Sequence, residues 1–410
     1  MKTRLDRSNF FIGTYILQDY ARTEQHIRDL ADCGIDVVMC MEYEDRAALD
    51  LFAKYGVGAV VNGVLPGWWG GNGERSGSMH EINTMDKYEA AANAFVDHPA
   101  IVGIDTGDEP SALDFPYYGK IIDFTENAFP NQFAYLNLYP NYASVSQNNA
   151  DETVCQLGTK TYAEHIAKYC ENVPTDYICY DFYMYSASVA GAYENLRIVA
   201  DACRDTGRDM WIVLQVNSNR PADWISENQL RFQAYSAMAF GTQSVIWACY
   251  TAGWWHNQVL DDKGEKTEQY EKLKKINHEI KPLAETYMKY RRTSTHFIGF
   301  DANDPDLAQL AYKPISALST GVFFDVCADA PIIAGQMVGK CKEEGHALML
   351  CVADDPHDKH PAQHEITFRA PYAKTVCAYK GAEKCVLLPD ESGVFHISAA
   401  SSEGILVTAK

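Results

Sequence analysis

Residues 34–64, GIDVVMCMEYEDRAALDLFAKYGVGAVVNGV, contain one complete unit of the repeat that decides the fold. An apolar run at 36–41 precedes an amphipathic stretch at 45–55, and a second apolar run follows at 58–64. This order predicts a strand, a helix and a second strand. Gly34 and Gly56 each follow a helical pattern and mark its end. Glycine readily adopts the positive φ with which a helix turns into the next strand.

The same unit recurs through the first three quarters of the chain. Apolar runs predict strands at residues 10–17, 36–41, 58–64, 101–105, 133–138, 177–183, 210–216 and 244–250. Helical patterns follow them at residues 23–33, 45–55, 85–96, 115–127, 162–172, 192–206, 227–240 and 268–288. Eight such alternations fill about the 250 residues of a typical (β/α)8 TIM barrel. No glycine-rich phosphate loop follows the first run, as a Rossmann sheet would favour, so we predict an α/β barrel domain at residues 1–292.

After residue 292 the helical periodicity stops. Short β-prone segments lie at residues 295–300, 307–312, 321–326, 347–352, 365–369, 375–379, 393–398 and 404–408. Strands at this spacing without intervening helices predict a small antiparallel β-sandwich. The second domain is therefore expected at residues 293–410.

Charge and motif content exclude several classes of partner. The chain carries 55 acidic and 35 basic residues, for a formal net charge of -20. A surface this negative repels phosphate backbones and anionic lipid headgroups, so neither a nucleic-acid nor a membrane partner is expected. The sequence contains no HExxH motif, paired CxxC, EF-hand or phosphate-cradling loop, so no metal and no other cofactor is predicted. A homo-oligomer is left open.

The 12 cysteines lie inside apolar runs such as residues 38–41 and 177–180, and no CxxC pair occurs. Free cysteine behaves as a small core hydrophobe, so buried reduced thiols are expected rather than a disulfide framework. Reduced thiols in turn predict a cytoplasmic protein.

The fourth predicted strand ends in GIDTGDEP, residues 103–110. In a parallel barrel the reactive groups come from the C-terminal ends of the strands and the loops after them. Pro110 stops the strand and holds the carboxyl of Glu109 at the barrel mouth. Cleavage of a glycosidic bond needs a carboxylic acid that protonates the leaving oxygen and a second carboxylate that acts as nucleophile or base. Glu109 fits the first role.

This stretch resembles the superfamily of clan A-like (β/α)8-barrel glycoside hydrolases, in which an Asn-Glu-Pro motif at the end of strand four carries the acid/base. Here the motif reads Asp108-Glu109-Pro110, so Asp108 stands where the Asn of the superfamily contacts a sugar hydroxyl. The preceding HPAIVG at residues 98–103 is similar to the start of strand four in that superfamily, and the C-terminal β-domain resembles the one appended to β-galactosidase-like barrels. The resemblance implies a glycosidase with Glu109 as acid/base.

The second carboxylate has several candidates. The superfamily places a nucleophilic Glu at the end of strand seven, but residues 211–217 read WIVLQVN, with Gln215 at that point. An amide cannot attack the anomeric carbon as an anion does. Three explanations stay open: an engineered Glu-to-Gln replacement, another carboxylate such as Asp181 or Glu42, or a barrel that binds sugar without cleaving it. A wider spacing to Asp181 or Glu42 would suit an inverting mechanism.

Aromatic and amide side chains predict a sugar-binding surface at the barrel mouth. Aromatic rings offer apolar faces on which a pyranose ring stacks, and amides bind its hydroxyls. The aromatic candidates are Trp68, Trp69, Tyr139, Tyr183, Tyr250, Trp254 and Trp255. The polar candidates are Glu42, Asp108, Asn137 and Asn217.

Together these features predict a β-galactosidase-like glycoside hydrolase that acts on oligosaccharides or glycosides, with Glu109, Asp181 and Gln215 as its catalytic residues. The alternative is a non-catalytic carbohydrate-binding barrel, which the amide at position 215 favours. Both interpretations make a carbohydrate the partner of this chain.

Overall fold

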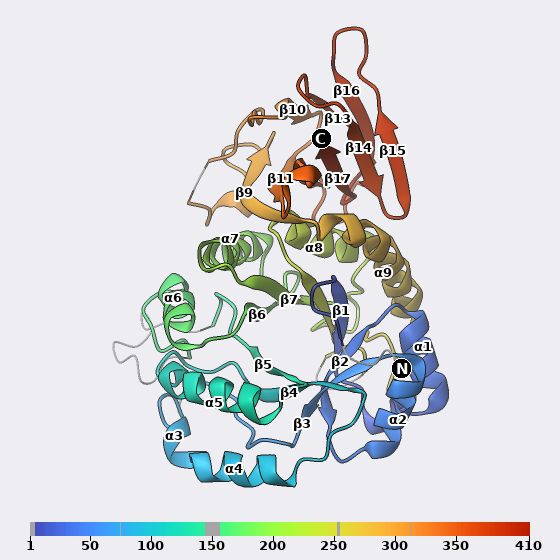
Figure 1. Cartoon of the computed structure of the whole chain (residues 1–410). Coiled ribbons are helices and arrows are strands. Elements are labelled where there is room, and N and C mark those ends of the chain that lie inside the picture. Colours follow the sequence, from blue (N-terminus) through green and yellow to red (C-terminus); the bar gives the residue numbers. More distant parts are fainter. Residues whose placement is uncertain (1–4, 74, 144–155, 252–254, 312) are drawn as a thin grey trace.

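The computed structural model describes residues 5–73, 75–143, 156–251, 255–311 and 313–410 (Figure 1). The chain folds into a parallel (β/α)8 barrel followed by an antiparallel β-domain, which confirms the predicted fold class. The β-domain sits against the helices on one side of the barrel (Figure 1).

Eight parallel strands form the barrel. They are β1 Phe11–Tyr15, β2 Val37–Glu42, β3 Gly58–Asn62, β4 Ile101–Asp108, β5 Phe133–Asn137, β6 Tyr177–Phe182, β7 Asp209–Gln215 and β8 Ser244–Ala248. Their order around the sheet is β5-β4-β3-β2-β1-β8-β7-β6. The backbone N–H of Leu138 donates to the carbonyl of Cys179 at 2.9 Å, so the chain after β5 bridges to β6 and closes the barrel. Each apolar run predicted in this domain therefore overlaps a barrel strand.

Helices cover the outside of the sheet (Figure 1). They are α1 Glu24–Asp32, α2 Arg46–Tyr55, α3 Met79–Ile82, α4 Met85–Ala94, α5 Phe115–Ala128, α6 Tyr162–Asn172, α7 Val189–Thr206, α8 Glu227–Ala239 and α9 Glu268–Tyr287. Side-chain caps explain where several of them begin: Thr161 and Ser226 form capping boxes at the starts of α6 and α8. The short α3 is the one helix in this group that no sequence pattern predicted.

Large aromatic side chains fill one end of the barrel interior. Trp211 stacks on Tyr177 with ring centroids 3.7 Å apart and an interplanar angle of 7°. Phe11 packs edge-on against the same indole at 4.9 Å. All three residues lie at the N-terminal ends of their strands, so this end is packed, and the open end is the one at which the strands finish.

The C-terminal domain consists of two antiparallel sheets. One is six-stranded and contains, in spatial order, β15 Glu383–Leu387, β14 Val376–Lys380, β17 Gly404–Ala409, β12 His346–Val352, β11 Ile332–Gly339 and β9 Tyr290–Ile298. The other is three-stranded and contains β10 Phe324–Ala328, β13 Gln363–Arg369 and β16 Phe395–Ala400. Buried apolar residues of both sheets, including Leu350, Ile366 and Val407, form one core, as expected for a sandwich.

The strands of this domain correct the sequence prediction at two points. The strand predicted at 307–312 is wrong for its described residues: Leu307 ends a short 3-10 helix, Pro305–Leu307, and residues 308–311 form a turn and a bend. Strands β11 and β15 were not predicted. Strand β9 begins at Tyr290 as part of the six-stranded sheet, and the domain boundary at residue 292 stays a prediction.

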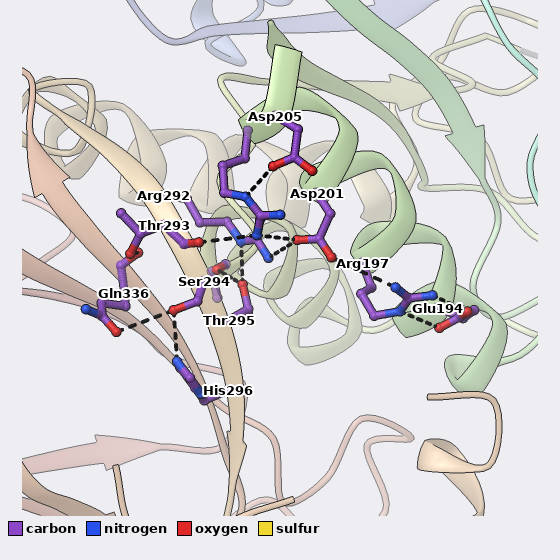
Figure 2. Close-up of polar contacts among 12 residues, drawn as sticks. Glu194, Arg197, Asp201, Asp205, Arg292, Thr293, Ser294, Thr295, His296 and Gln336 are labelled. Carbon is purple, nitrogen blue, oxygen red and sulfur yellow. Dashed lines mark hydrogen bonds and ion pairs between the residues drawn. The ribbon is translucent and has the colours of Figure 1, made fainter. Parts of the chain in front are cut away.

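The two domains are joined by a close and partly polar interface. Helix α8 packs against β11, β12 and β17. A side chain at Gly335 of β11 would overlap the carbonyl oxygen of Ala239, which follows from the close approach of strand and helix. Beside it, Arg292 of β9 donates to Asp201 of α7 at 3.0 Å and to the hydroxyl of Thr295 at 2.7 Å (Figure 2). These contacts fix the β-domain on α7 and α8.

Two further observations concern the chain as a whole. Every helix in the described part is too short or too polar to cross a lipid bilayer. The cysteines of that part are all free.

Candidate active site

A cavity of about 540 Å³ opens at the C-terminal ends of the barrel strands. It is lined by Tyr15, Ile16, Cys40, Trp69, Asp108, Glu109, Asn137, Asp181, Tyr183, Val213, Ala248 and Cys249. Seven of the eight strands, all except β3, contribute a lining residue of their own. The cavity therefore lies where parallel barrels place their functional groups.

Glu109 is held in the cavity by the chain around it. Its backbone N–H donates to the carbonyl of Asn137 at 2.9 Å, and its φ of 47° is unusual for a residue other than glycine. The indole N–H of Trp69 donates to Oε2 of Glu109 at 3.0 Å. A backbone conformation of this kind persists only where the surroundings enforce it, and such positions cluster at functional sites.

Asn137 connects two further carboxylates of the cavity. Its Nδ2 donates to Oδ1 of Asp181 at 2.9 Å and to Oδ1 of Asp108 at 3.1 Å. Both carboxylates are partly stabilised in their ionised form by these bonds. The amide therefore fixes the positions of two acidic groups from different strands relative to each other.

The carboxyls of the cavity have raised pKa values because they are buried close together. Burial, followed by the charges of Asp181 and Asp108, raises the pKa of Glu109 to about 9. Burial and the charge of Asp108 raise the pKa of Asp181 to about 7. Burial raises the pKa of Asp108 to about 6, against the hydrogen bond from Asn137. Glu109 is therefore the group that keeps its proton to the highest pH.

Asp181 is one of the acidic neighbours that favour the protonated form of Glu109. The two side chains line the same cavity. The order of their pKa values, about 9 and about 7, places the proton of the pair on Glu109. The pair is thus a protonated acid and a more acidic carboxyl in one cavity.

Beneath the pair, polar side chains continue toward the barrel centre. The hydroxyls of Tyr15 and Tyr135 lie 2.7 Å apart. The thiol of Cys40 contacts Asp105 at 3.5 Å, and burial raises the pKa of Asp105 to about 7. In the described part of the cavity, the lining residues include no Arg, Lys or His. The site is therefore acidic without a neutralising cation.

Trp69 and Tyr183 are the predicted aromatic residues that line the cavity. Trp69 is 55% exposed, so most of its ring is free to contact a ligand. Trp255 packs edge-on against Tyr183, with ring centroids 4.4 Å apart. Trp254 lies outside the described residues.

The structure does not bring the other predicted binding residues to the cavity wall. Trp68 is buried, and the guanidinium of Arg75 lies 4.2 Å from its ring centroid. The hydroxyl of Tyr139 donates to the carbonyl of Gly71 at 2.7 Å. The remaining members of this group are Tyr250 and Asn217, which are buried outside the lining, and Glu42, which pairs with Arg22 at 2.8 Å.

Gln215 is also buried outside the lining, and both ends of its amide are engaged. Oε1 accepts from the backbone N–H of Tyr185 at 2.9 Å. Nε2 donates to the hydroxyl of Ser186 and to the carbonyl of Asn217, each at 2.9 Å. A glutamate here would lose the donor that faces the carbonyl of Asn217, so the site suits an amide. The lining residue of β7 is Val213.

Several lining residues were not predicted from the sequence: Tyr15, Ile16, Cys40, Val213, Ala248 and Cys249. All lie at or near the C-terminal end of a strand, so extending the strand-end rule to every strand would have found them. The described residues contain no group of three or more His, Cys, Asp or Glu placed to hold a metal ion.

No protein-family model and no curated protein sequence matches the chain. Among solved structures, it is similar in fold to several glycoside hydrolases. One is a mutant of a family 5 mannosidase from Rhizomucor miehei, with a TM-score of 0.45 and 12% identity over 68% of this chain and 95% of that chain. An endoglucanase from Pseudomonas stutzeri gives a TM-score of 0.41 and 14% identity over 65% and 93% of the two chains. A glucosidase from Croceicoccus marinus gives 0.41 and 9% over 98% and 96%.

Proposed function

We propose that the chain is a glycoside hydrolase in which Glu109 is the general acid and Asp181 is the second carboxylate. The observation that carries the proposal is a pair of carboxyls with separated pKa values in one cavity, about 9 for Glu109 and about 7 for Asp181. Between these values the first group holds its proton while the second is ionised. Glycosidic bond cleavage needs this combination of an acid and a carboxylate.

The neighbours of the pair support these roles. Glu109 protonates the leaving oxygen, and ionised Asp181 acts on the anomeric carbon. Trp69 orients Glu109 through its indole N–H at 3.0 Å, and its exposed ring offers a face for sugar stacking. Asn137 orients Asp181 through the bond at 2.9 Å. Each reacting group is thus positioned by one further side chain.

The separation of the two carboxyls decides the stereochemical outcome. Inverting enzymes separate them by about 6.5–9.5 Å to admit a water molecule, and retaining enzymes by about 5–5.5 Å. Because Glu109 and Asp181 line one cavity and Asp181 raises the pKa of Glu109, we propose that Asp181 is a nucleophile and that the configuration is retained. An inverted first product would make Asp181 the base that activates water.

The finer prediction, β-galactosidase-like specificity, belongs to this proposal and rests on the β-domain that follows the barrel. It is tested with a panel of aryl glycosides that contains galactosides, glucosides and mannosides in both anomeric forms. The anomer of the first product, followed by NMR, distinguishes retention from inversion.

The test of the mechanism uses matched carboxamide variants. Glu109→Gln and Asp181→Asn should each lower kcat/KM at least about 100-fold, and azide should rescue Asp181→Asn by forming a glycosyl azide. Asp123→Asn, on the exposed face of α5, is the control and should leave kcat/KM unchanged. Gln215→Glu should not raise kcat/KM, because a carboxylate disrupts the hydrogen bonds of the amide.

The alternative function is decided by the same measurements. If the unaltered chain cleaves no glycoside of the panel while sugars raise its Tm, the barrel binds carbohydrate without cleaving it. If Gln215→Glu gains activity, the explanation of an engineered residue is correct and the role of Asp181 is wrong.

A further inference from the structure

The C-terminal β-domain contacts the barrel beside the candidate active site. The contact falls on the loop between β6 and α7, residues 183–188, which follows Asp181 closely and includes the cavity residue Tyr183. We propose that the β-domain positions this loop, and with it Asp181 and Tyr183, through Tyr185. The proposal rests on the proposed function and adds a positioning role to a domain that lies outside the cavity.

Tyr185 makes the contact between the domains. Its hydroxyl donates to the carbonyl of Pro356 at 2.9 Å and lies 3.4 Å from the carbonyl of Gln229. Pro356 belongs to the loop between β12 and β13. The carboxylate of Asp355 holds that loop in shape, because it accepts from the backbone N–H groups of Lys359 at 2.8 Å and His360 at 2.5 Å. The acceptor for Tyr185 is therefore a fixed point of the β-domain.

Gln215 holds the same loop from the barrel side. Its Oε1 accepts from the backbone N–H of Tyr185, and its Nε2 donates to the hydroxyl of Ser186. Its own backbone N–H donates to Oε1 of Gln233 on α8 at 3.0 Å. Gln215 is thus a positioning residue between β7, α8 and the loop after Asp181. This role explains why an amide stands at the end of strand seven.

Close packing of the β-domain on the barrel fixes the acceptor of the Tyr185 hydrogen bond. Helix α8, which holds Gln233, packs closely on the six-stranded sheet, and a side chain at Gly404 of β17 would overlap the ring of Tyr235. Arg292 of β9 donates a hydrogen bond to Asp201 on the neighbouring helix α7 (Figure 2). Packed interfaces of this kind shift as units rather than deform gradually. The carbonyl of Pro356 therefore keeps its position relative to the barrel.

Tyr185→Phe tests the proposal by removing only the hydroxyl. With the loop released, water reaches Asp181 more easily, and its pKa, which burial raises, should fall. The acidic limb of the pH profile of kcat/KM should then move to lower pH. We also expect kcat/KM at the optimum to fall roughly tenfold, the scale of a small misplacement of a reacting group.

Tyr290→Phe is the matched control. It also removes a hydroxyl that donates to a backbone carbonyl, that of Glu344 at 3.0 Å, but within the β-domain and away from the loop. Its acidic limb and kcat/KM should equal those of the unaltered protein. If Tyr185→Phe behaves like Tyr290→Phe in both readouts, or differs from it only in Tm, the proposal is wrong.

A second measurement does not depend on catalysis. Amide hydrogen exchange, read by mass spectrometry on peptides that cover residues 183–188, should be faster in Tyr185→Phe and unchanged in Tyr290→Phe. If the unaltered protein cleaves no glycoside, the proposed function fails while this comparison still tests the contact between the domains. Equal exchange in the two variants would overturn the inference.

Discussion

Burial raises the pKa of all three carboxyls at the barrel mouth, and single neighbours then make their acidities differ. Asp108 and Asp181 each accept a hydrogen bond from Asn137, which favours their ionised forms. Glu109 accepts one from Trp69 but lies beside two other acidic groups, whose charges favour its protonated form. Glu109 therefore releases its proton last, which suits an acid.

These pKa values predict a bell-shaped pH profile of kcat/KM. Activity should rise with pH as Asp181 ionises, near its pKa of about 7, and fall as Glu109 loses its proton, near its pKa of about 9. The optimum should lie between these values. Initial rates on an aryl glycoside, measured at closely spaced pH values, define both limbs.

Asp108→Asn checks the electrostatic cause of this profile. The charge of Asp108 raises the pKa of both Asp181 and Glu109, so its removal should move both limbs to lower pH. An optimum near the ordinary pKa of a carboxyl in the unaltered protein would contradict the assignment. Limbs that stay in place in Asp108→Asn would show that burial alone sets them.

At the scale of elements, the segment after β3 holds the end of β4. The backbone N–H of Asp108 donates to the carbonyl of Trp68 at 2.9 Å, and that of Gly70 donates to the carbonyl of Asp108 at 3.0 Å. A side chain at Gly70 would overlap the carbonyl oxygen of Glu109. Glycine is therefore required where this segment passes Glu109, the proposed catalytic acid.

Gly70→Ala should displace the backbone of Glu109 and lower both stability and activity. Overfilling a packed site costs roughly 1–3 kcal/mol in the free energy of unfolding. Urea unfolding and kcat/KM measure the two effects. Gly67→Ala in the same segment is the control, because a Cβ there meets no atom within 4 Å. Equal stability and activity of the two variants would show that the segment adapts without cost.

Whether a helix or strand was predicted from the sequence depended on which of its faces are buried. Barrel strands and helices were predicted because the apolar runs and the amphipathic stretches have different periods. Strand β11 was missed because α8 covers one of its faces and the sandwich core the other, so its sequence IIAGQMVG does not alternate. Strand β15 was missed because it is a largely exposed edge, EKCVL, with little apolar pattern.

At the scale of the whole molecule, the net charge of the chain and the carboxyls of the cavity both disfavour an anionic ligand. The net charge is -20, and the described cavity lining carries carboxyls without a basic residue. An anionic sugar would meet a repulsive potential on approach and in the site. Neutral saccharides fit this environment better.

Aryl glucuronides should therefore be poorer substrates than the matching neutral glycosides. We expect kcat/KM to be lower by at least about tenfold, which corresponds to about 1.4 kcal/mol, and the difference to shrink as added salt screens the charges. Steady-state rates at two ionic strengths measure this. Equal rates for a glucuronide and its neutral counterpart would show that the sugar binds away from the carboxyls.

Local pattern by itself determined the order of strands and helices, the presence of a second β-domain and the prominence of Glu109 and Asp181. These follow from periodicity, turn residues and the rule that parallel strands end at one rim, all of which act over a few neighbouring residues. Only the tertiary structure decided which side chains meet there. It brought Asn137 to two carboxylates and Tyr15 to the cavity, and it turned Gln215 into a link to the β-domain. Burial, pKa and contacts between distant residues depend on how the closed barrel and its attached domain pack, which no single stretch of sequence records.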